Sequence, residues 1–345
     1  MFNVITASTI LVSFFVTLYL LPKWIKKAHF AGLEGKDVHK RDQHLVAEVG
    51  GICVIAGFIA GLLAYIATRT FIFEGGTGYI SLVLATLVSV MIALVIGVLD
   101  DILGWKIGLS RRSKILLTFA IPIPIMVINA GVSKITLPLL GHVELGLVFP
   151  LVLVPLAIIG TANAFNMLAG YNGLEALQGI VILSTLGFIS YLSGSSFAAV
   201  IAFCMVVSLC AFLLFNYYPS MLFPGDSMTY SVGALIGIVA ILGNIEKYAL
   251  IMFIPYFFEF VLKARGKMQK ESFADRNVDG SLRNRYKKFY GLEHVAIALL
   301  SKLRIKPYEW RVVWSIVSVE ILLALTALFY FYLHTHLADL LQFFV

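Results

Sequence analysis

The chain has 345 residues, of which 60% are hydrophobic and only 13% charged, and its formal net charge is +7. Soluble globular domains carry about 25% charged residues, so this composition excludes a soluble protein and indicates an integral membrane protein. The three cysteines, Cys53, Cys204 and Cys210, lie inside apolar runs, so we expect them to pack in the interior rather than to form disulfides.

Apolar runs long enough to cross a bilayer follow one another along the chain. A membrane-spanning helix needs about 20 residues, and the first run has no positively charged leader, so it is predicted to be a permanent span. About ten spans are predicted. They lie at residues 3–22, 49–67, 78–98, 113–131, 146–164, 173–193, 197–216, 228–244, 247–264 and 312–334. We therefore expect an all-α polytopic membrane protein with one domain, 1–345, and a short hairpin or interfacial connection at 132–145.

Basic residues are concentrated in the odd-numbered loops between these spans. The even-numbered connections hold only Arg69, Lys134 and Lys247. Because Lys and Arg stay on the cytoplasmic side, the odd loops are predicted to be cytoplasmic and both termini to lie outside. A basic face also suits anionic lipids, phosphates or nucleotides, although this bias always sets topology. The predicted cytoplasmic loops are 23–48, 99–113, 164–173, 216–228 and 265–311, the last with short interfacial elements.

Carboxylate and amide side chains gather at the cytoplasmic ends of the predicted spans. They come from four different odd-numbered loops and comprise Glu48, Asp100, Asp101, Asn163, Asn166 and Asp226. The orientation was derived from Lys and Arg alone, yet it places all of these groups on one face. Ionisable groups at membrane depth are costly and favour a functional role. The sequence therefore predicts one composite site on the cytoplasmic face.

Oxygen ligands of this kind suit Mg²⁺, which proteins hold with one or two carboxylates together with substrate phosphates. Each group alone also has a structural explanation. An asparagine pair can join two helices, and Lys114 can anchor the end of a span, although beside Asp100 and Asp101 it could hold a diphosphate. His39 and His44 lack zinc spacing, and structural roles are expected for them. No phosphate-binding glycine loop, serine-hydrolase motif or zinc-protease motif occurs.

Four stretches resemble one known family. They are "GVLDDILG", "NAFNMLAGYNGLEA", "FPGDSMTYSVG" and "GKDVHK" followed by "AEVGG". Together they resemble the polyprenyl-phosphate N-acetylhexosamine-1-phosphate transferase superfamily, over nearly the whole chain. The closer resemblance is to its eukaryotic and archaeal type, the UDP-GlcNAc–dolichyl-phosphate GlcNAc-1-phosphotransferases, because bacterial members typically have aspartate where this chain has Ala169. The resemblance implies ten spans and a cytoplasmic active site.

The resemblance also implies roles for individual residues. Asn166 and Asp226 would bind Mg²⁺, or Mn²⁺ in its place. Asp100 and Asp101 would handle the acceptor phosphate and the surroundings of the metal, and Lys114 would hold the donor diphosphate. The positions assigned to substrate binding are Glu48, Asn163, Gly170, Asn172, Phe223, Arg276 and Asn277.

Within the substrate-binding set, Phe223 would stack on uracil and Asn172 would read the edge of the base. The ninth loop departs from the family pattern. It has neither the Arg-His-Arg stretch of eukaryotic members nor the histidine cluster of bacterial ones, so Arg276 and Asn277 are assigned only by their place in this loop. The identity of the amino sugar is therefore the least determined part of the prediction.

The expected reaction transfers GlcNAc-1-phosphate from UDP-GlcNAc to a dolichyl or other polyprenyl phosphate, with UMP as the second product. The alternative is the same chemistry with another UDP-amino sugar, and a distant alternative is a transporter or flippase. We expect membrane lipid but no nucleic acid among the partners, and a homodimer is left open. The expected location is an archaeal plasma membrane, or the endoplasmic reticulum if the source is eukaryotic.

Overall fold

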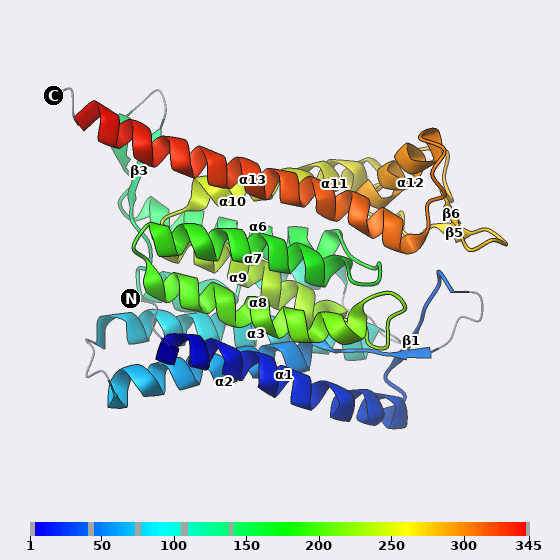
Figure 1. The fold of residues 1–345 in the computed structure, drawn as a ribbon, viewed down its shortest axis with the longest axis horizontal. Coiled ribbons are helices and arrows are strands. Elements are labelled where there is room, and N and C mark those ends of the chain that lie inside the picture. The colour runs from blue at the N-terminus through cyan, green and yellow to red at the C-terminus, as the bar shows by residue number, and fades with distance from the viewer. Residues whose placement is uncertain (1–3, 41–44, 73–76, 105–109, 138–140, 343–345) are drawn as a thin grey trace.

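The computed structural model describes residues 4–40, 45–72, 77–104, 110–137 and 141–342. Its long helices lie side by side along one axis (Figure 1). Within the described residues, eight helices are long and apolar enough to cross a membrane, which confirms the predicted all-α polytopic class. They are α1 (Val4–Ala31), α2 (Gly51–Phe71), α3 (Ile80–Gly104), α6 (Val154–Met167) with the preceding π-helical turn η2 (Phe149–Leu153), α7 (Leu174–Leu192), α8 (Ser196–Asn216), α9 (Gly225–Gly243) and α13 (Glu309–Gln342).

The two other predicted spans, 113–131 and 247–264, each form two short helices instead of one. These are α4 (Arg111–Thr118), α5 (Ile123–Val127), α10 (Glu246–Met252) and α11 (Ile254–Arg265). Proline explains both interruptions, since Pro122 lies directly before α5 and Pro255 lies in the first turn of α11. Proline has no backbone N–H and disfavours helical geometry in the residue before it. The prediction of ten membrane crossings therefore requires that α4 with α5, and α10 with α11, each cross the membrane as a pair of short helices.

Short elements occupy the two ends of the bundle. The first and ninth loops place β1, β5, β6 and α12 at one end, and β3 lies at the other end with the start of α1 and the end of α13 (Figure 1). The hairpin expected within 132–145 is present as the antiparallel pair of β3 and β4. The bounds are β1 (Glu34–Lys36), β2 (Leu45–Ala47), η1 (Thr77–Tyr79), β3 (Lys134–Leu137), β4 (Gly141–Glu144), β5 (Asp275–Arg276), β6 (Leu282–Arg283) and α12 (Leu292–Lys302).

Helix α9 is the most enclosed of the long helices. About nine-tenths of its apolar window is buried (89%), and it contacts α2, α3, α6, α7, α8 and α10. Small residues allow neighbouring backbones to approach it closely, as is common between membrane helices. A methyl group added at Gly97 of α3 would lie only 2.4 Å from the Cα atom of Ser227 in α9. The first turn of α9, which carries Asp226, is therefore fixed against the last turns of α3.

We predict that Gly97→Ala destabilises the protein by about 1–3 kcal/mol, the usual effect of overpacking, because the new methyl group meets backbone that cannot move aside. Thermal unfolding of the purified protein in detergent measures this. Gly160→Ala is the matched control, because an added methyl group there has no neighbouring atom within 4 Å. Equal melting temperatures for the two variants would contradict the close packing of α3 on α9.

Candidate active site

A cleft of about 310 Å³ opens where the first, third and seventh loops meet. Apart from Gly225, every residue that lines this cleft was predicted to belong to the site. The lining consists of Glu48, Asp100, Asp101, Lys114, Phe223, Gly225 and Asp226. Residues separated by up to 178 positions in the sequence (48 to 226) thus share one small surface. The structure thus brings together residues from three of the four loops of the predicted composite site, whereas no residue of the fifth loop lines this cleft. The roles of the individual residues stay predictions.

Three helix ends supply all the charged groups of the cleft except Glu48, which lies in the first loop. Asp100 and Asp101 lie in the last turns of α3, Lys114 in the first turn of α4 and Asp226 in the first turn of α9. The helix α4 begins there because Ser110 is its N-cap, and the Ser110 side chain accepts a hydrogen bond from the Ser113 N–H (3.1 Å). Lys114 therefore lies in the first turn of a helix whose start contacts the two acidic helix ends.

The Lys114 ammonium group lies between two carboxylates. It contacts the carboxylate of Asp100 directly, and its Nζ atom is 3.3 Å from Oδ2 of Asp226. The side chains of both Lys114 and Asp226 remain partly exposed in the cleft, with 30% and 26% of their surface accessible. A ligand phosphate can therefore reach the ammonium group, which is the property required of a diphosphate-binding lysine.

Asp101 has a position that the sequence did not predict. Its Oδ1 accepts the backbone N–H of Asp226 (2.7 Å) and its Oδ2 accepts that of Ser227 (3.2 Å), so it caps α9 from another helix. The N-cap residue of α9, Pro224, has no side-chain acceptor of its own. Gly225, at φ +71°, leaves room for this carboxylate, because an added Cβ would lie 2.4 Å from Asp101 Oδ2. The sequence signal was a helix that starts with Pro-Gly and lacks a capping side chain.

Glu48 and Phe223 are brought together by backbone pairing between the first and seventh loops. The Phe223 N–H donates to the Ala47 carbonyl (2.8 Å), and the Gly50 N–H donates to the Phe223 carbonyl (2.9 Å). Both side chains are half-buried at the edge of the cleft. Burial, and secondly the negative charge of Asp101, raises the pKa of Glu48 above its usual range.

Negative charge exceeds positive charge in the cleft. Four carboxylates line it, and Lys114 is the one cationic side chain among the described lining residues. Asp100 is buried, and its Oδ1 has no hydrogen-bond partner in the described structure. Buried polar atoms normally have partners, so this carboxylate oxygen is available to a ligand of the cleft. Carboxylate oxygens with an excess of negative charge are a donor set that suits a hard divalent cation.

The two asparagines of α6 lie against neighbouring helices. Asn166 Oδ1 accepts the hydroxyl of Thr229 (2.7 Å), one turn after Asp226 in α9, so Asn166 lies beside the first turn of that helix. The Asn163 amide donates to the Thr118 hydroxyl (3.2 Å) and to the Ile159 carbonyl (2.8 Å). Asn163 thus joins α6 to α4, which is the structural role that a membrane asparagine often has. Its predicted part in substrate binding is not visible in these contacts.

The four remaining predicted residues do not line this cleft. Asn277 forms the turn of the β5–β6 hairpin, where its amide donates to the Ser281 hydroxyl (3.0 Å), and Arg276 lies in the adjacent strand β5. The Gly170 N–H donates to Glu175 (2.7 Å) at the start of α7. Asn172 is buried and bonded to residues of the first loop and of α13.

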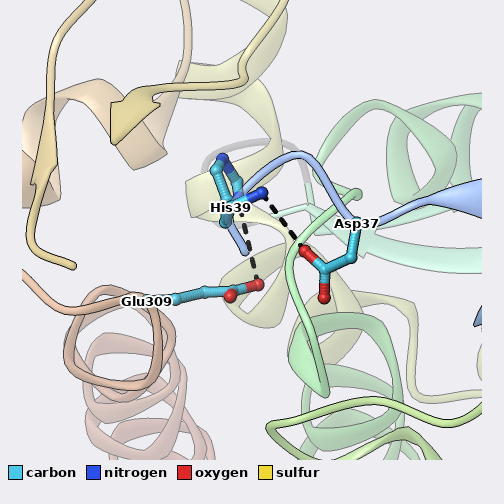
Figure 2. Close-up of side chains that lie close together, drawn as sticks. All are labelled: Asp37, His39 and Glu309. Carbon is cyan, nitrogen blue, oxygen red and sulfur yellow. Dashed lines mark hydrogen bonds and ion pairs between the residues drawn. The ribbon is translucent and has the colours of Figure 1, made fainter. Parts of the chain in front are cut away.

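Those bonds to Asn172 belong to a second buried polar cluster that sequence reasoning missed. Asp37 and His39 of the first loop and Glu309 at the start of α13 point toward one another (Figure 2). A structural role was expected for His39, and Glu309 was not among the predicted residues. The only sequence signal was that Asp37 and His39 lie in one of the stretches that resemble the family.

The described chain is thus a polytopic membrane protein with an acidic cleft, which contains one lysine, at the ends of its helices. Residues 83–244, from α3 to the end of α9, match glycosyl transferase family 4. This range contains Asp100, Asp101, Lys114, Asn166 and Asp226.

Similar proteins come from archaea, eukaryotes and bacteria. A protein of Sulfolobus acidocaldarius, provisionally named UDP-N-acetylglucosamine–dolichyl-phosphate N-acetylglucosaminephosphotransferase, is 33% identical over 92% of this chain and 94% of its own length. A Dictyostelium discoideum protein with the same name, without the proviso, is 28% identical over 71% and 68%. A Streptococcus pyogenes phospho-N-acetylmuramoyl-pentapeptide-transferase is 27% identical over 95% and 99%. This chain belongs to glycosyl transferase family 4 and is a membrane enzyme of that family.

We predict that Asp101→Ala lowers stability by about 1–2 kcal/mol, because two backbone N–H groups at the start of α9 lose their acceptor. Asp101→Asn keeps one acceptor oxygen and should lose less. Asp226→Asn is the control, since it also removes one negative charge but leaves the capping bonds in place. Thermal unfolding of the three variants would contradict the capping role if Asp226→Asn were the least stable.

Proposed function

We propose that this enzyme transfers GlcNAc-1-phosphate from UDP-GlcNAc to a dolichyl or other polyprenyl phosphate, which begins lipid-linked oligosaccharide assembly for N-glycans. The observation that carries the proposal is the cleft, in which three aspartates and Lys114 meet at one end of the bundle. The names of the Sulfolobus and Dictyostelium relatives support the choice of sugar and lipid.

The residues of the cleft fit a Mg²⁺ ion, and Mn²⁺ would suit the same oxygen ligands. Asp226, together with Asn166 beside the first turn of α9, would hold the ion. Asp100, whose Oδ1 has no partner in the described structure, lines the same cleft. Such an ion would supply positive charge against the donor diphosphate and the departing UMP. Without a cation, the four carboxylates of the cleft would repel a diphosphate.

The side chains then act mainly by positioning, as is usual in phosphoryl transfer. Lys114 binds the donor diphosphate and Phe223 stacks on the uracil ring. Asp100 orients the acceptor phosphate or takes its remaining proton. An oxygen of the lipid phosphate forms a bond to the β-phosphorus of UDP-GlcNAc, and the bond between that phosphorus and the bridging oxygen breaks. UMP leaves with this oxygen, and the C1–O bond of the sugar stays intact.

The place of the cleft suits a lipid acceptor. It lies at the end of the bundle, so a phosphate head group can enter while the polyprenyl tail stays among lipid-facing helices. We place this end in the cytoplasm, because the basic first and ninth loops lie there, and both termini outside. The archaeal relative supports an archaeal plasma membrane. A transporter would instead hold its polar site near the midplane.

The second candidate is the same transfer with another UDP-amino sugar. The observation that favours it is the ninth loop, in which Asn277 is part of a hairpin turn and neither family pattern of sugar-binding residues is present. The relative from Streptococcus pyogenes, named for a pentapeptide-bearing sugar, is similar over nearly the same length.

The nucleotide product tests the proposed reaction. Purified protein with UDP-GlcNAc, Mg²⁺ and a short polyprenyl phosphate should release UMP and leave two phosphates between lipid and sugar. Attack at the anomeric carbon would release UDP and leave one phosphate, which would contradict the proposal. Parallel reactions with UDP-GalNAc, UDP-glucose and UDP-MurNAc-pentapeptide identify the sugar, and we expect UDP-GlcNAc to react fastest.

The role of Asp226 is tested by Asp226→Ala in the same assay with excess Mg²⁺. The substitution removes a ligand oxygen and one charge while α9 stays capped by Asp101, so we expect turnover to fall by roughly two orders of magnitude or more, with normal folding. Turnover near that of the wild type would exclude Asp226 from the metal site.

A further inference from the structure

Asp37, His39, Lys40, Asn172 and Glu309 form a buried polar cluster, here called the loop latch. Figure 2 shows three of its members converging from two chain segments. Asp37, His39, Asn172 and Glu309 are each at most 5% exposed. The latch joins the first loop, the fifth loop and the start of α13, and none of its charged residues lines the acidic cleft.

Glu309 is held by donors from two loops. Its Oε2 accepts from the Lys40 ammonium group (3.0 Å), and its Oε1 accepts from the backbone N–H of Asn172 (3.0 Å). The Nδ1 atom of His39 lies 3.5 Å from the same Oε1. Both oxygens of this buried carboxylate therefore face nitrogen atoms of the protein itself.

Asp37 is held in the same way. Its Oδ1 accepts the backbone N–H of His39 (3.2 Å), and its Oδ2 accepts the side-chain amide of Asn172 (3.0 Å). The Lys40 Nζ atom lies 3.7 Å from Oδ2. Asn172 consequently donates one hydrogen bond from its backbone and one from its side chain to the two carboxylates of the latch.

A metal ion is the obvious alternative, because one ligand atom each from Asp37, His39 and Glu309 lies within 4.8 Å of the others. The contacts favour the latch. Lys40 already contributes a positive charge to both carboxylates, and His39 Nε2 accepts the Ala274 N–H (3.4 Å). In the described structure no polar atom of Asp37, His39 or Glu309 is buried without a partner, in contrast to Asp100 of the cleft.

The latch also holds the ninth loop close to the fifth. His39 packs on Tyr171 (ring centroids 4.6 Å apart) and contacts Phe273 (5.8 Å). The Tyr171 hydroxyl donates to the Ser272 carbonyl (3.2 Å). The Phe273 ring lies over Gly170, where an added Cβ would be 3.0 Å from it. Displacing His39 would therefore remove contacts to Tyr171 of the fifth loop and to Phe273 and Ala274 of the ninth.

We propose that the loop latch is a positioning device for the nucleotide donor, in which the charge of Lys40 sets the place of Asn172 and of the fifth loop. The inference rests on the proposed function, since Asn172 is the residue expected to read the base. Lys40 and Glu309 act through Asn172 and do not touch the reacting phosphates. The latch thus acts on donor binding from outside the cleft, whereas Asp226 and Lys114 face the phosphates that react.

The test separates KM from kcat. In Lys40→Met and Glu309→Gln, we expect the KM for UDP-GlcNAc to rise roughly tenfold to a hundredfold, the effect of leaving a buried charge without its partner, while kcat changes much less. Lys40→Arg keeps the charge and should restore most of the affinity. Lys306→Met is the matched control. It removes the same charge from an exposed pair with Asp279 (2.8 Å) in the ninth loop, and its KM should equal that of the wild type.

A merely structural role would lower kcat through a smaller active fraction and leave KM unchanged, and this result would overturn the proposal. If Glu309→Gln fails to fold, the affinity for UMP is measured by calorimetry in Lys40→Met and Lys40→Arg instead. Equal affinity for UMP in these two variants would also overturn the proposal. Wild-type protein that releases no UMP from UDP-GlcNAc would refute the proposed function. Active wild-type protein with unaltered KM in the variants would refute the latch alone.

Discussion

Asp101 of α3 caps the first turn of α9, and this contact joins the two helix ends that carry most of the acidic groups of the cleft. The backbone N–H groups of Asp226 and Ser227, in the first turn of this buried helix, have no acceptor within the helix. Asp101 of α3 accepts both. The N-terminus of a helix attracts negative charge, so it stabilises the carboxylates gathered around it. The glycine contact between α3 and α9 allows this capping, because the two backbones must approach closely for Asp101 to reach. The capped first turn of α9 positions Asp226, and Lys114 contacts both Asp226 and Asp100.

Two acidic clusters lie at the same end of the bundle, and they balance their charge differently. In the loop latch, Lys40 and backbone or side-chain N–H groups meet the carboxylate oxygens, which gives a closed and rigid connection between loops. In the cleft, Lys114 faces several carboxylates, and an oxygen of Asp100 has no partner in the described structure. A buried carboxylate with all its bonds made can position neighbours, whereas one with an unmet bond can bind a ligand.

Much of this arrangement could be predicted from the sequence, because membrane topology restricts the possibilities. The positions of Lys and Arg fixed which loops share a face, and this was enough to bring Glu48, Asp100 and Asp226 together. Hydropathy could not reveal the proline interruptions inside 113–131 and 247–264, since the apolar composition continues through them. Nor could it reveal the pairing of Lys40 with Glu309, because that contact depends on how two loops 269 positions apart fold over each other.

We expect the cleft, and not the loop latch, to bind the divalent cation. Electron paramagnetic resonance of Mn²⁺ added to the protein with UDP measures this directly. One bound Mn²⁺ should be seen with the wild type and with Glu309→Gln, and it should be lost in Asp226→Asn. Mn²⁺ that stays bound in Asp226→Asn and is lost in Glu309→Gln would contradict the account.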